Sequence, residues 1–417
     1  GLILINRFGD KINLPQKINR AFREPGSNRG MEASEYVLSI AEMLIGGATC
    51  LEDIRLFEND EAYKEMAEVY HYPTSDAIGD WLRRHGGRDG EQRLWSVLSS
   101  VVQSGMTGAR SSGLTLDIDG TLIEADKGDA EFTYKGFRGY HPLLGGSLEL
   151  GLFVGSRFQQ GNAVPQSDLV RFIHEDCLKN MPGTFTTIRS DSAGFNSDVI
   201  NYCFEHHLCF TITADHDVAV MEAIRKIPES EWNQGKNDDG SVASYQVAET
   251  VHSLEKTTHS FRLVVKRIRD THQQDLFNGH YRYWIIATNI PQREKGAQAI
   301  IHFQNQRGEF EKMIGELKHH YGLDHVPCGQ FDANSLYFTI GILAFTLVQL
   351  LKRHYFGPEW KKKSVRSLRY YWLHVPSRIV SHARYIVAKV AMTRVLFEQL
   401  LRIYLQLSLA PAAISSA

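Results

Sequence analysis

Three acidic residues stand out because of the segments that carry them. Asp119 ends a segment of alternating apolar and polar residues, and Asp191 follows a second strand-like segment. Glu311 lies in a helix-like segment, four residues after Arg307 and seven before Lys318, so these three share one helical face. Carboxylate oxygens are the ligands that hard divalent cations prefer, and Arg and Lys bind phosphate groups. The set therefore suits a site that binds both metal and phosphate.

A fourth carboxylate, Asp117, lies two residues before Asp119. Apolar and polar residues alternate along 114–119, which is the period of a β-strand and places both carboxylates on one face. Asp117 is therefore either a metal ligand itself or a group that supports the ligand. The spacing alone leaves both interpretations open.

The segments that must position these residues begin with a helical region. We predict that residues 1–110 form a helical DNA-binding region, with one helix over 31–45 that ends at two glycines. A second helix, capped by Thr74 or Ser75, carries Trp81 and ends in basic residues, as in a helix-turn-helix reader of DNA. One more helix of a small bundle accounts for the same pattern, so this alternative stays open.

Two later regions, 111–217 and 296–350, predict the two parts of one α/β domain with a mixed sheet flanked by helices. Strands come first there, and helices and strands then alternate. Residues 218–295 between them predict a β-rich insertion, and helical signals continue through the basic region 351–417. The further strands expected in the first part are 131–137, 148–154, 184–189 and 209–213, with helices at 167–179 and 197–206.

At the three acids the chain resembles a DDE transposase of bacterial insertion sequences, with an RNase H-like catalytic domain. That group carries the signature Tyr-x2-Arg-x3-Glu-x6-Lys, and Arg307, Glu311 and Lys318 match its last three positions. The Tyr position is Gln304 here, with Phe303 beside it. The residues around Arg307, Asn-Gln-Arg-Gly at 305–308, look most like those of insertion-sequence family thirteen-eighty. Other matching segments are Asp-Gly-Thr at 119–121, Gly-Tyr-His-Pro-Leu at 139–143, Arg-x-Asp-Ser at 189–192 and Tyr-Arg-Tyr at 281–283.

The resemblance implies that Asp119, Asp191 and Glu311 are catalytic and hold Mg²⁺, for which Mn²⁺ substitutes. Asp119 is preferred over Asp117 because the family's ligand precedes a small residue and Thr. Two such ions stabilise the attacking and leaving oxygens of a phosphodiester displacement. The resemblance also implies that Arg307 and Lys318 bind phosphates of the terminal inverted repeats. It further implies a target DNA, a dimer on DNA, and a place in the bacterial cytoplasm, at the nucleoid when bound.

Charge is unevenly distributed along a nearly neutral chain. The 46 basic and 48 acidic residues give a net charge of −2, so no overall basic field advertises nucleic-acid binding. The range 352–394, however, holds eleven Lys and Arg and a single acid, Glu359. Such clustering is typical of a phosphate-backbone contact. The DNA-binding residues predicted here are Lys361, Lys362, Lys363, Arg366 and Arg369.

Two tryptophans of the predicted insertion differ in setting. Related transposases use an aromatic residue of the β insertion to hold a base flipped out of the DNA end. Trp284 alternates within a strand, which predicts a core position, whereas Trp232 lies beside a polar segment. By resemblance, Trp232 is therefore the better candidate for base holding.

A rival resemblance starts at Asp117. The segment 116–122 also matches the first motif of haloacid-dehalogenase-type phosphatases, in which the first Asp attacks phosphorus and the second is the general acid/base. That site also needs an acidic pair after an apolar strand, and the close candidate, Asp238 with Asp239, lies in a polar segment. The phosphatase leaves the Arg307 helix unexplained. A catalytically inactive, DNA-binding relative is a third alternative.

The remaining signals bound the class of protein. The five cysteines form no Cys-x-x-Cys pair and are odd in number, which argues against a disulfide framework or a zinc knuckle and fits a reducing cytoplasm. The longest apolar run, 336–351, has 16 residues and includes Thr339, Thr346 and Gln349. It is short for a membrane span and predicts a buried helix.

Overall fold

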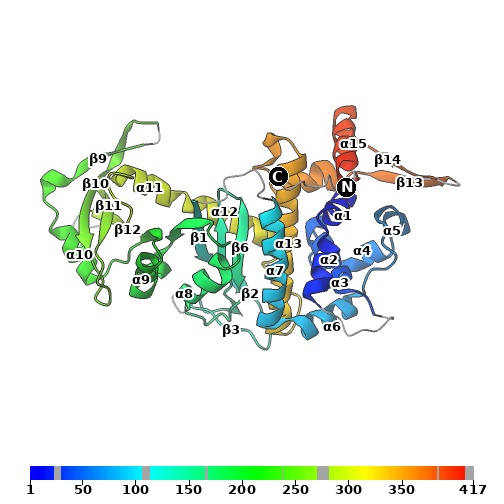
Figure 1. Ribbon diagram of the computed structural model, residues 1–417, viewed down its shortest axis with the longest axis horizontal. Helices are drawn as coiled ribbons and strands as arrows, with labels where there is room; N and C mark the ends of the chain where they lie inside the picture. The colour runs from blue at the N-terminus through cyan, green and yellow to red at the C-terminus, as the bar shows by residue number, and fades with distance from the viewer. Residues whose placement is uncertain are drawn as a thin grey trace.

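The computed structural model describes residues 1–22, 30–105, 113–164, 168–237, 239–269, 281–382 and 385–408. A nine-stranded sheet extends from the centre of the molecule to one end of it (Figure 1). Its strand order is β6-β5-β1-β7-β8-β12-β11-β10-β9. Its first five strands are β1 (Leu114–Gly120), β5 (Leu143–Ser147), β6 (Leu152–Arg157), β7 (Phe185–Ser190) and β8 (Cys209–Thr213).

Strand directions in this half of the sheet are mixed. β1 pairs antiparallel with β5 and parallel with β7, and β7 pairs parallel with β8. The five residues Leu114–Ile118 of β1 are all buried, as expected for a central strand covered on both faces. The order and directions confirm the predicted RNase H-like mixed sheet.

The predicted β-rich insertion extends the same sheet. Its strand β12 pairs antiparallel with β8, so the hydrogen-bonded ladder continues without a break. Helix α10 (Val218–Arg225) packs against β10. The four strands are β9 (Asn233–Lys236), β10 (Val242–His252), β11 (Phe261–Arg269) and β12 (Tyr281–Thr288).

A second, three-stranded sheet lies between β1 and β5 in the sequence, with the order β2-β4-β3. It comprises β2 (Ile123–Glu124), β3 (Glu131–Phe132) and β4 (Arg138–Tyr140). The strand predicted over 131–137 is therefore wrong beyond Phe132. The chain turns back there because Gly136 adopts a positive φ of 86° and the Thr133 amide donates to the Phe137 carbonyl at 2.8 Å. The strand predicted over 148–154 is likewise interrupted, by the turn that joins β5 to β6.

Helices between β6 and β8, within the insertion and after β12 lie around the nine-stranded sheet. α12 (Arg307–His320) packs so closely on β5 that a Cβ at Gly146 would lie 2.6 Å from the Phe310 ring. The helix predicted over 167–179 is mostly π-helical, and its first residue lies outside the described ranges. The other helices around the sheet are α8 (Leu169–Arg171), η2 (Phe172–Leu178), η3 (Ser192–Gly194), α9 (Ser197–Glu205), η4 (Glu229–Glu231) and α11 (Ala297–Asn305).

The N-terminal region is helical, as predicted. α3 stops where Gly47 takes a left-handed conformation with φ 95°, and the Thr74 hydroxyl caps α6 by accepting from the Ala77 amide at 3.2 Å. The elements are α1 (Ile3–Lys11), α2 (Leu14–Ala21), α3 (Ala33–Gly46), η1 (Leu51–Ile54), α4 (Arg55–Glu58), α5 (Glu61–Ala67), α6 (Ser75–His85) and α7 (Gly87–Gly105).

One long helix, α13 (Phe331–Tyr355), joins this region to the sheet. It contacts α3, α6, α7 and β6, and a single apolar core extends from α1 through the sheet to α15. Among the described residues it is the one helix long and apolar enough to cross a membrane, but 94% of its most apolar window is buried inside the protein. The apolar run of 336–351 is thus a core helix, as predicted. All five cysteines are free.

The C-terminal region departs from the helical prediction. A hairpin of β13 (Ser377–His382) and β14 (Tyr385–Val390) separates the short helices from α15, so the prediction of a helical region over 351–417 is wrong at these two strands. α15 returns to α1, where Lys11 Nζ donates to the Gln406 carbonyl at 2.6 Å. The helices here are η5 (Pro358–Trp360), α14 (Val365–Leu368), η6 (Arg369–Leu373) and α15 (Arg394–Ser408).

The central position of α13 leads to a stability prediction. Phe345 is fully buried between Phe153 of β6 and Tyr321, with ring centroids 5.0 and 5.7 Å away. Phe345→Ala should lower the free energy of unfolding in urea by about 3–5 kcal/mol through the cavity it leaves. Tyr370→Ala, at an exposed position, should change it by less than about 0.5 kcal/mol. Equal effects of the two changes would contradict a continuous core at Phe345.

Candidate active site

The three predicted carboxylates come from three different elements and meet at one edge of the sheet. Asp119 lies near the end of β1, and Asp191 directly follows β7, where its Oδ1 accepts from the Ala193 amide at 3.1 Å. Both line one small cavity of about 110 Å³, together with Tyr134 and His141. Glu311 lies on α12, one turn after Arg307.

Arg307 connects two of these carboxylates. Its Nη2 lies 2.9 Å from Asp119 Oδ2 and 2.9 Å from Glu311 Oε1. One guanidinium nitrogen thus bridges the two carboxylates. Asp119 is largely buried, whereas the Glu311 side chain is 54% exposed. The predicted helical face of Arg307 and Glu311 is thus present, with Arg307 turned onto the acids.

At Asp119, burial and neighbouring acids outweigh the nearby positive charge of Arg307. Burial raises its pKa to about 6, and the negative charges of Asp191 and Glu311 add to that increase, while Arg307 opposes it. A divalent cation would relieve both the burial cost and the repulsion. The donor set, three carboxylates without sulfur or imidazole, fits a hard ion such as Mg²⁺.

Asp119, Asp191 and Glu311 do not surround a common point in this structure. Within the described ranges, no group of three or more His, Cys, Asp and Glu side chains is placed to hold a metal ion. Arg307 supplies the positive charge between Asp119 and Glu311 in this conformation. A metal ion shared by Asp119 and Glu311 would have to displace this guanidinium from at least one of them.

Asp117 has a different partner and a different surrounding. It is fully buried, and both of its oxygens accept from Arg189 of the neighbouring strand, at 2.6 Å from Nε and 2.9 Å from Nη2. A carboxylate held in this way is not available to attack a phosphate or to coordinate a metal ion. Asp119, and not Asp117, lines the cavity, which removes the basis of the phosphatase alternative. Asp238 of that alternative lies outside the described residues, and Asp239 is bound to Ser241 on the surface.

Arg189 also reaches the end of α11 and the residue that precedes α12, the helix that carries Glu311. Its Nη1 donates to the Phe303 carbonyl at 2.7 Å and to Gln306 Oε1 at 3.1 Å, and its guanidinium lies 4.7 Å from the centre of the Phe303 ring. Gln304, at the Tyr position of the signature, is buried and donates to the Ser190 carbonyl at 2.8 Å. Arg189 and Gln304 therefore fasten the end of α11, just before the start of α12, to β7.

Lys318 lies further along the same helix and is half-buried. Its Nζ donates to the Leu122 carbonyl at 2.6 Å, next to a second and larger cleft of about 700 Å³. Burial lowers its pKa. The structure thus places Lys318 at the wall of the cleft that adjoins the carboxylate cavity, and not in that cavity itself.

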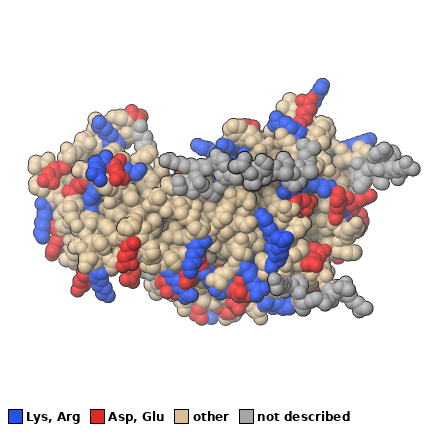
Figure 2. All heavy atoms as spheres, in the orientation of Figure 1, with Lys and Arg blue, Asp and Glu red and all other residues tan. Residues whose placement is uncertain are grey.

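The predicted basic residues of the C-terminal region separate into two groups. Lys361, Lys362, Lys363 and Arg366 are exposed. Arg369 instead donates to the carbonyls of Leu44, Ile45 and His320 at 2.6–2.7 Å and so closes the C-terminal ends of α3 and α12. These contacts account for Arg369 without DNA. Figure 2 shows basic and acidic side chains interspersed over one face, in keeping with the net charge of −2.

The two tryptophans of the insertion occupy the reverse of their predicted positions. Trp232 is only 8% exposed and lies under Arg267, whose guanidinium carbon is 3.9 Å from the ring centre. Trp284 is 46% exposed on β12, with Lys266 Nζ 5.2 Å from its ring. The prediction that Trp232 holds a flipped base is therefore wrong, because its ring is already covered.

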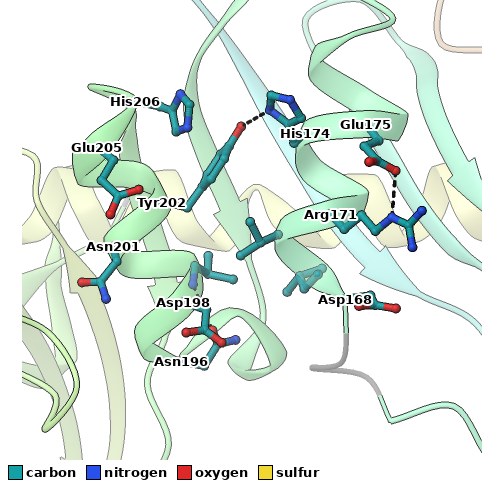
Figure 3. A pocket seen from close by; sticks show the side chains of 13 residues that line it. Asp168, Arg171, His174, Glu175, Asn196, Asp198, Asn201, Tyr202, Glu205 and His206 are labelled. Atoms are coloured by element: carbon teal, nitrogen blue, oxygen red, sulfur yellow. Dashed lines mark hydrogen bonds and ion pairs between the residues drawn. The ribbon is translucent and has the colours of Figure 1, made fainter.

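A cavity of about 710 Å³ opens between η2 and α9 (Figure 3). The His174 ring bonds the Tyr202 hydroxyl at 2.9 Å, and Arg171 pairs with Glu175 at 2.9 Å. The acids on its walls, Asp168, Glu175, Asp198 and Glu205, outnumber the one arginine. Such a surface is unfavourable for phosphate, and the described residues around it include no excess of basic side chains to offset that repulsion.

The RNase H-like sheet and the carboxylates at its edge define the class of protein. Residues 1–412 match the family described as "Transposase DDE domain group 1", and the chain belongs to this family. It is thus a DDE transposase, an enzyme that binds DNA, cleaves it and transfers the cut strands with the help of a divalent metal. The predicted transposase family is confirmed.

Solved structures and curated proteins were also compared. The chain is similar to a piggyBac transposase in the cryo-EM structure of its synaptic complex with hairpin DNA. The two are 12% identical, with a TM-score of 0.45, over 96% of this chain and 84% of that chain. No curated protein matches.

The contrast between Asp117 and Asp119 gives a prediction for stability. Asp117→Asn leaves Arg189 buried without its ion pair and should lower the free energy of unfolding by about 3–5 kcal/mol. Asp119→Asn should cost less than about 1 kcal/mol or stabilise the protein, because its ionised form is already disfavoured by burial. Urea unfolding measures both. Similar losses for the two variants would contradict their assignment to different environments.

The same contrast has a pH dependence. The pKa of Asp119 is higher in the folded protein than the usual 3.8, so the folded state binds more protons between that value and about 6. The Asp119 contribution to stability therefore falls as the pH rises through this window. Asp119→Asn should remove that fall, and unfolding curves at pH 4, 5, 6 and 7 would show it. A wild-type dependence that persists unchanged in the variant would exclude Asp119 as its source.

Proposed function

We propose that Asp119, Asp191 and Glu311 hold the divalent metal of this transposase, with Mg²⁺ as the natural ion and Mn²⁺ able to replace it. The observation that supports this most is the shared contact of Arg307 with Asp119 and Glu311 at 2.9 Å, beside the cavity that Asp119 and Asp191 line. When bound, the metal ions would stabilise the attacking and leaving oxygens of the phosphodiester. The substrates of this chemistry are the terminal inverted repeats of an insertion sequence and a target DNA.

Arg307 has two alternative partners in this proposal. It neutralises Asp119 and Glu311 while no metal is bound, and it turns to a DNA phosphate once a metal takes over that neutralisation. Arg is suited to both because its planar fork matches carboxylate and phosphate equally. Lys318 binds a second phosphate as a point charge from the wall of the neighbouring cleft.

The remaining parts of the chain bind and arrange DNA. We infer that 1–110 is a DNA-binding region, that 111–217 and 296–350 form the catalytic domain around the 218–295 insertion, and that the basic region 351–417 contacts the phosphate backbone. The exposed Lys361, Lys362, Lys363 and Arg366 support the last of these roles. We further propose a dimer on DNA, membership of insertion-sequence family thirteen-eighty, and action in the bacterial cytoplasm.

The carboxylates can be tested by isosteric amides. Asp119→Asn, Asp191→Asn and Glu311→Gln should each reduce Mn²⁺-dependent nicking of DNA with the element's ends to background, because each removes a metal ligand. DNA binding should stay within about threefold of wild type. Glu309→Gln is the matched control, since Glu309 is exposed on the same helix and pairs with Lys312. Normal nicking by any of the three variants removes that residue from the site.

The basic residues can be tested by salt dependence. Replacing Lys361, Lys362 and Lys363 with Ala should weaken binding to any DNA and reduce the slope of log K against log salt by roughly three units, through lost counterion release. Arg369→Ala should instead lower the melting temperature and leave the slope unchanged, because its partners are backbone carbonyls. A slope that is unaltered in the triple variant would place the DNA elsewhere.

A further inference from the structure

The 700 Å³ cleft beside the carboxylates has a lining that the metal chemistry does not use. Gly120, Tyr134 and His141 line both this cleft and the carboxylate cavity, so the two spaces adjoin. A ligand in the cleft therefore lies next to the cavity that Asp119 and Asp191 line. The volume is that of a site for one small molecule, which suits one or two nucleotides and not a duplex.

One wall is the turn between β3 and β4, which presents Tyr134 and Lys135. Tyr134 is 70% exposed, and Lys135 Nζ lies 5.9 Å from the centre of its ring. The turn is closed by the 2.8 Å bond from the Thr133 amide to the Phe137 carbonyl. The His141 ring meets Tyr134 edge-on, with ring centroids 6.2 Å apart, and most of the Tyr134 side chain remains open to a base that stacks on it.

The sheet that carries this turn is anchored to the core. The Tyr140 hydroxyl at the end of β4 donates to Asp129 at 2.7 Å, and Asp129 also accepts from the Phe331 amide at the start of α13. The β2-β4-β3 sheet is therefore fixed relative to the helix that organises the fold. A stacking surface that is fixed in this way loses little entropy when a base binds.

Two cations face the cleft from opposite elements. Lys135 comes from the turn and Lys318 from α12, and the positive charge of Lys135, after burial, lowers the pKa of Lys318. Two acids, Asp324 and Glu124, also line the cleft. Asp324 raises the pKa of Lys318, but its carboxylate is hydrogen-bonded to the rings of His319 and His325 at 3.2 and 2.9 Å. An anion between the two lysines would relieve their mutual repulsion.

His141 adds a buried polar group at the junction of the two spaces. It is 4% exposed, and although the ring interacts with the backbone of Ala163, its Nδ1 has no hydrogen-bond partner of good geometry among the described residues. The ring lies against Gly120, where a Cβ would be 2.5 Å from Nε2, so a larger residue at 120 would displace it. A buried ring nitrogen without a partner is costly, and a ligand in the adjoining space can supply that partner.

We propose that this cleft binds an unpaired nucleotide of the DNA strand next to the phosphodiester held at the carboxylates. Its base stacks on Tyr134, its phosphate lies between Lys135 and Lys318, and His141 bonds to the sugar-phosphate. Stacking of this kind tolerates any base. The site rests on the proposed function, since it assigns the strand that the carboxylates act on, and it is a binding site in its own right.

The test uses the full chain without divalent ions and a ten-nucleotide oligothymidylate that contains one central 2-aminopurine. Wild type and Tyr134→Phe should quench the 2-aminopurine on binding, and Tyr134→Ala should lose the quenching and bind about tenfold more weakly, as removal of one stacked base predicts. Lys135→Gln should weaken binding with quenching at saturation retained. Phe132→Ala is the control, because Phe132 is exposed on the same sheet but does not line the cleft.

Unchanged affinity and quenching in Tyr134→Ala would overturn the proposal, as would an equal loss in Phe132→Ala. Failure here is distinct from failure of the metal site. Nicking that is lost in Asp119→Asn, together with normal oligonucleotide binding by Tyr134→Ala, would refute the nucleotide cleft and leave the transposase chemistry intact.

Discussion

The buried ion pair between Asp117 and Arg189 is the interaction on which the geometry of the site depends. The two residues are direct neighbours in the parallel register of β1 and β7, and each lies two residues before one of the proposed metal-binding carboxylates, Asp119 and Asp191. Because side chains alternate along a strand, fixing this pair also brings Asp119 and Asp191 to the same edge and face of the sheet. The remaining donors of Arg189 then hold the backbone at Phe303, just ahead of the helix that carries Glu311. One guanidinium thus sets the relative position of three elements.

A buried pair of this kind is a poor source of net stability, because the cost of removing both charges from water offsets most of their attraction. Its contribution is to specificity, because other pairings of β1 with β7 would separate the two buried charges. A slip of β1 against β7 by one residue would leave the Asp117 charge buried without its partner, together with the Nε and Nη2 donors of Arg189 that now bind it. The pair therefore selects one register among several that apolar packing alone would accept.

The sequence predicted the parts of this site that depend on local spacing. A step of four places Arg307 and Glu311 on one helical face in any α-helix, and the 3.6-residue repeat needs no tertiary information. The pairing of Asp117 with Arg189 joins residues far apart in the chain, so only the strand register reveals it. The same applies to Arg369, whose partners are carbonyls of two distant helix ends, and to Trp232, which is covered by an arginine from another strand. Gly136 was the local signal that the strand predicted over 131–137 ends early, because a glycine within a strand pattern marks a turn.

The unbroken ladder from β8 to β12 has a mechanical consequence. An insertion joined by two flexible linkers would move as a tethered body, and DNA bound to it would exert little force on the catalytic centre. Here β12 is hydrogen-bonded along β8, and β8 along β7, which ends next to Asp191. The insertion is therefore joined to the RNase H-like sheet by continuous strand pairing and not by flexible linkers alone. Any load applied to its outer strands is transmitted as twist of the sheet to the strand that holds one of the three carboxylates.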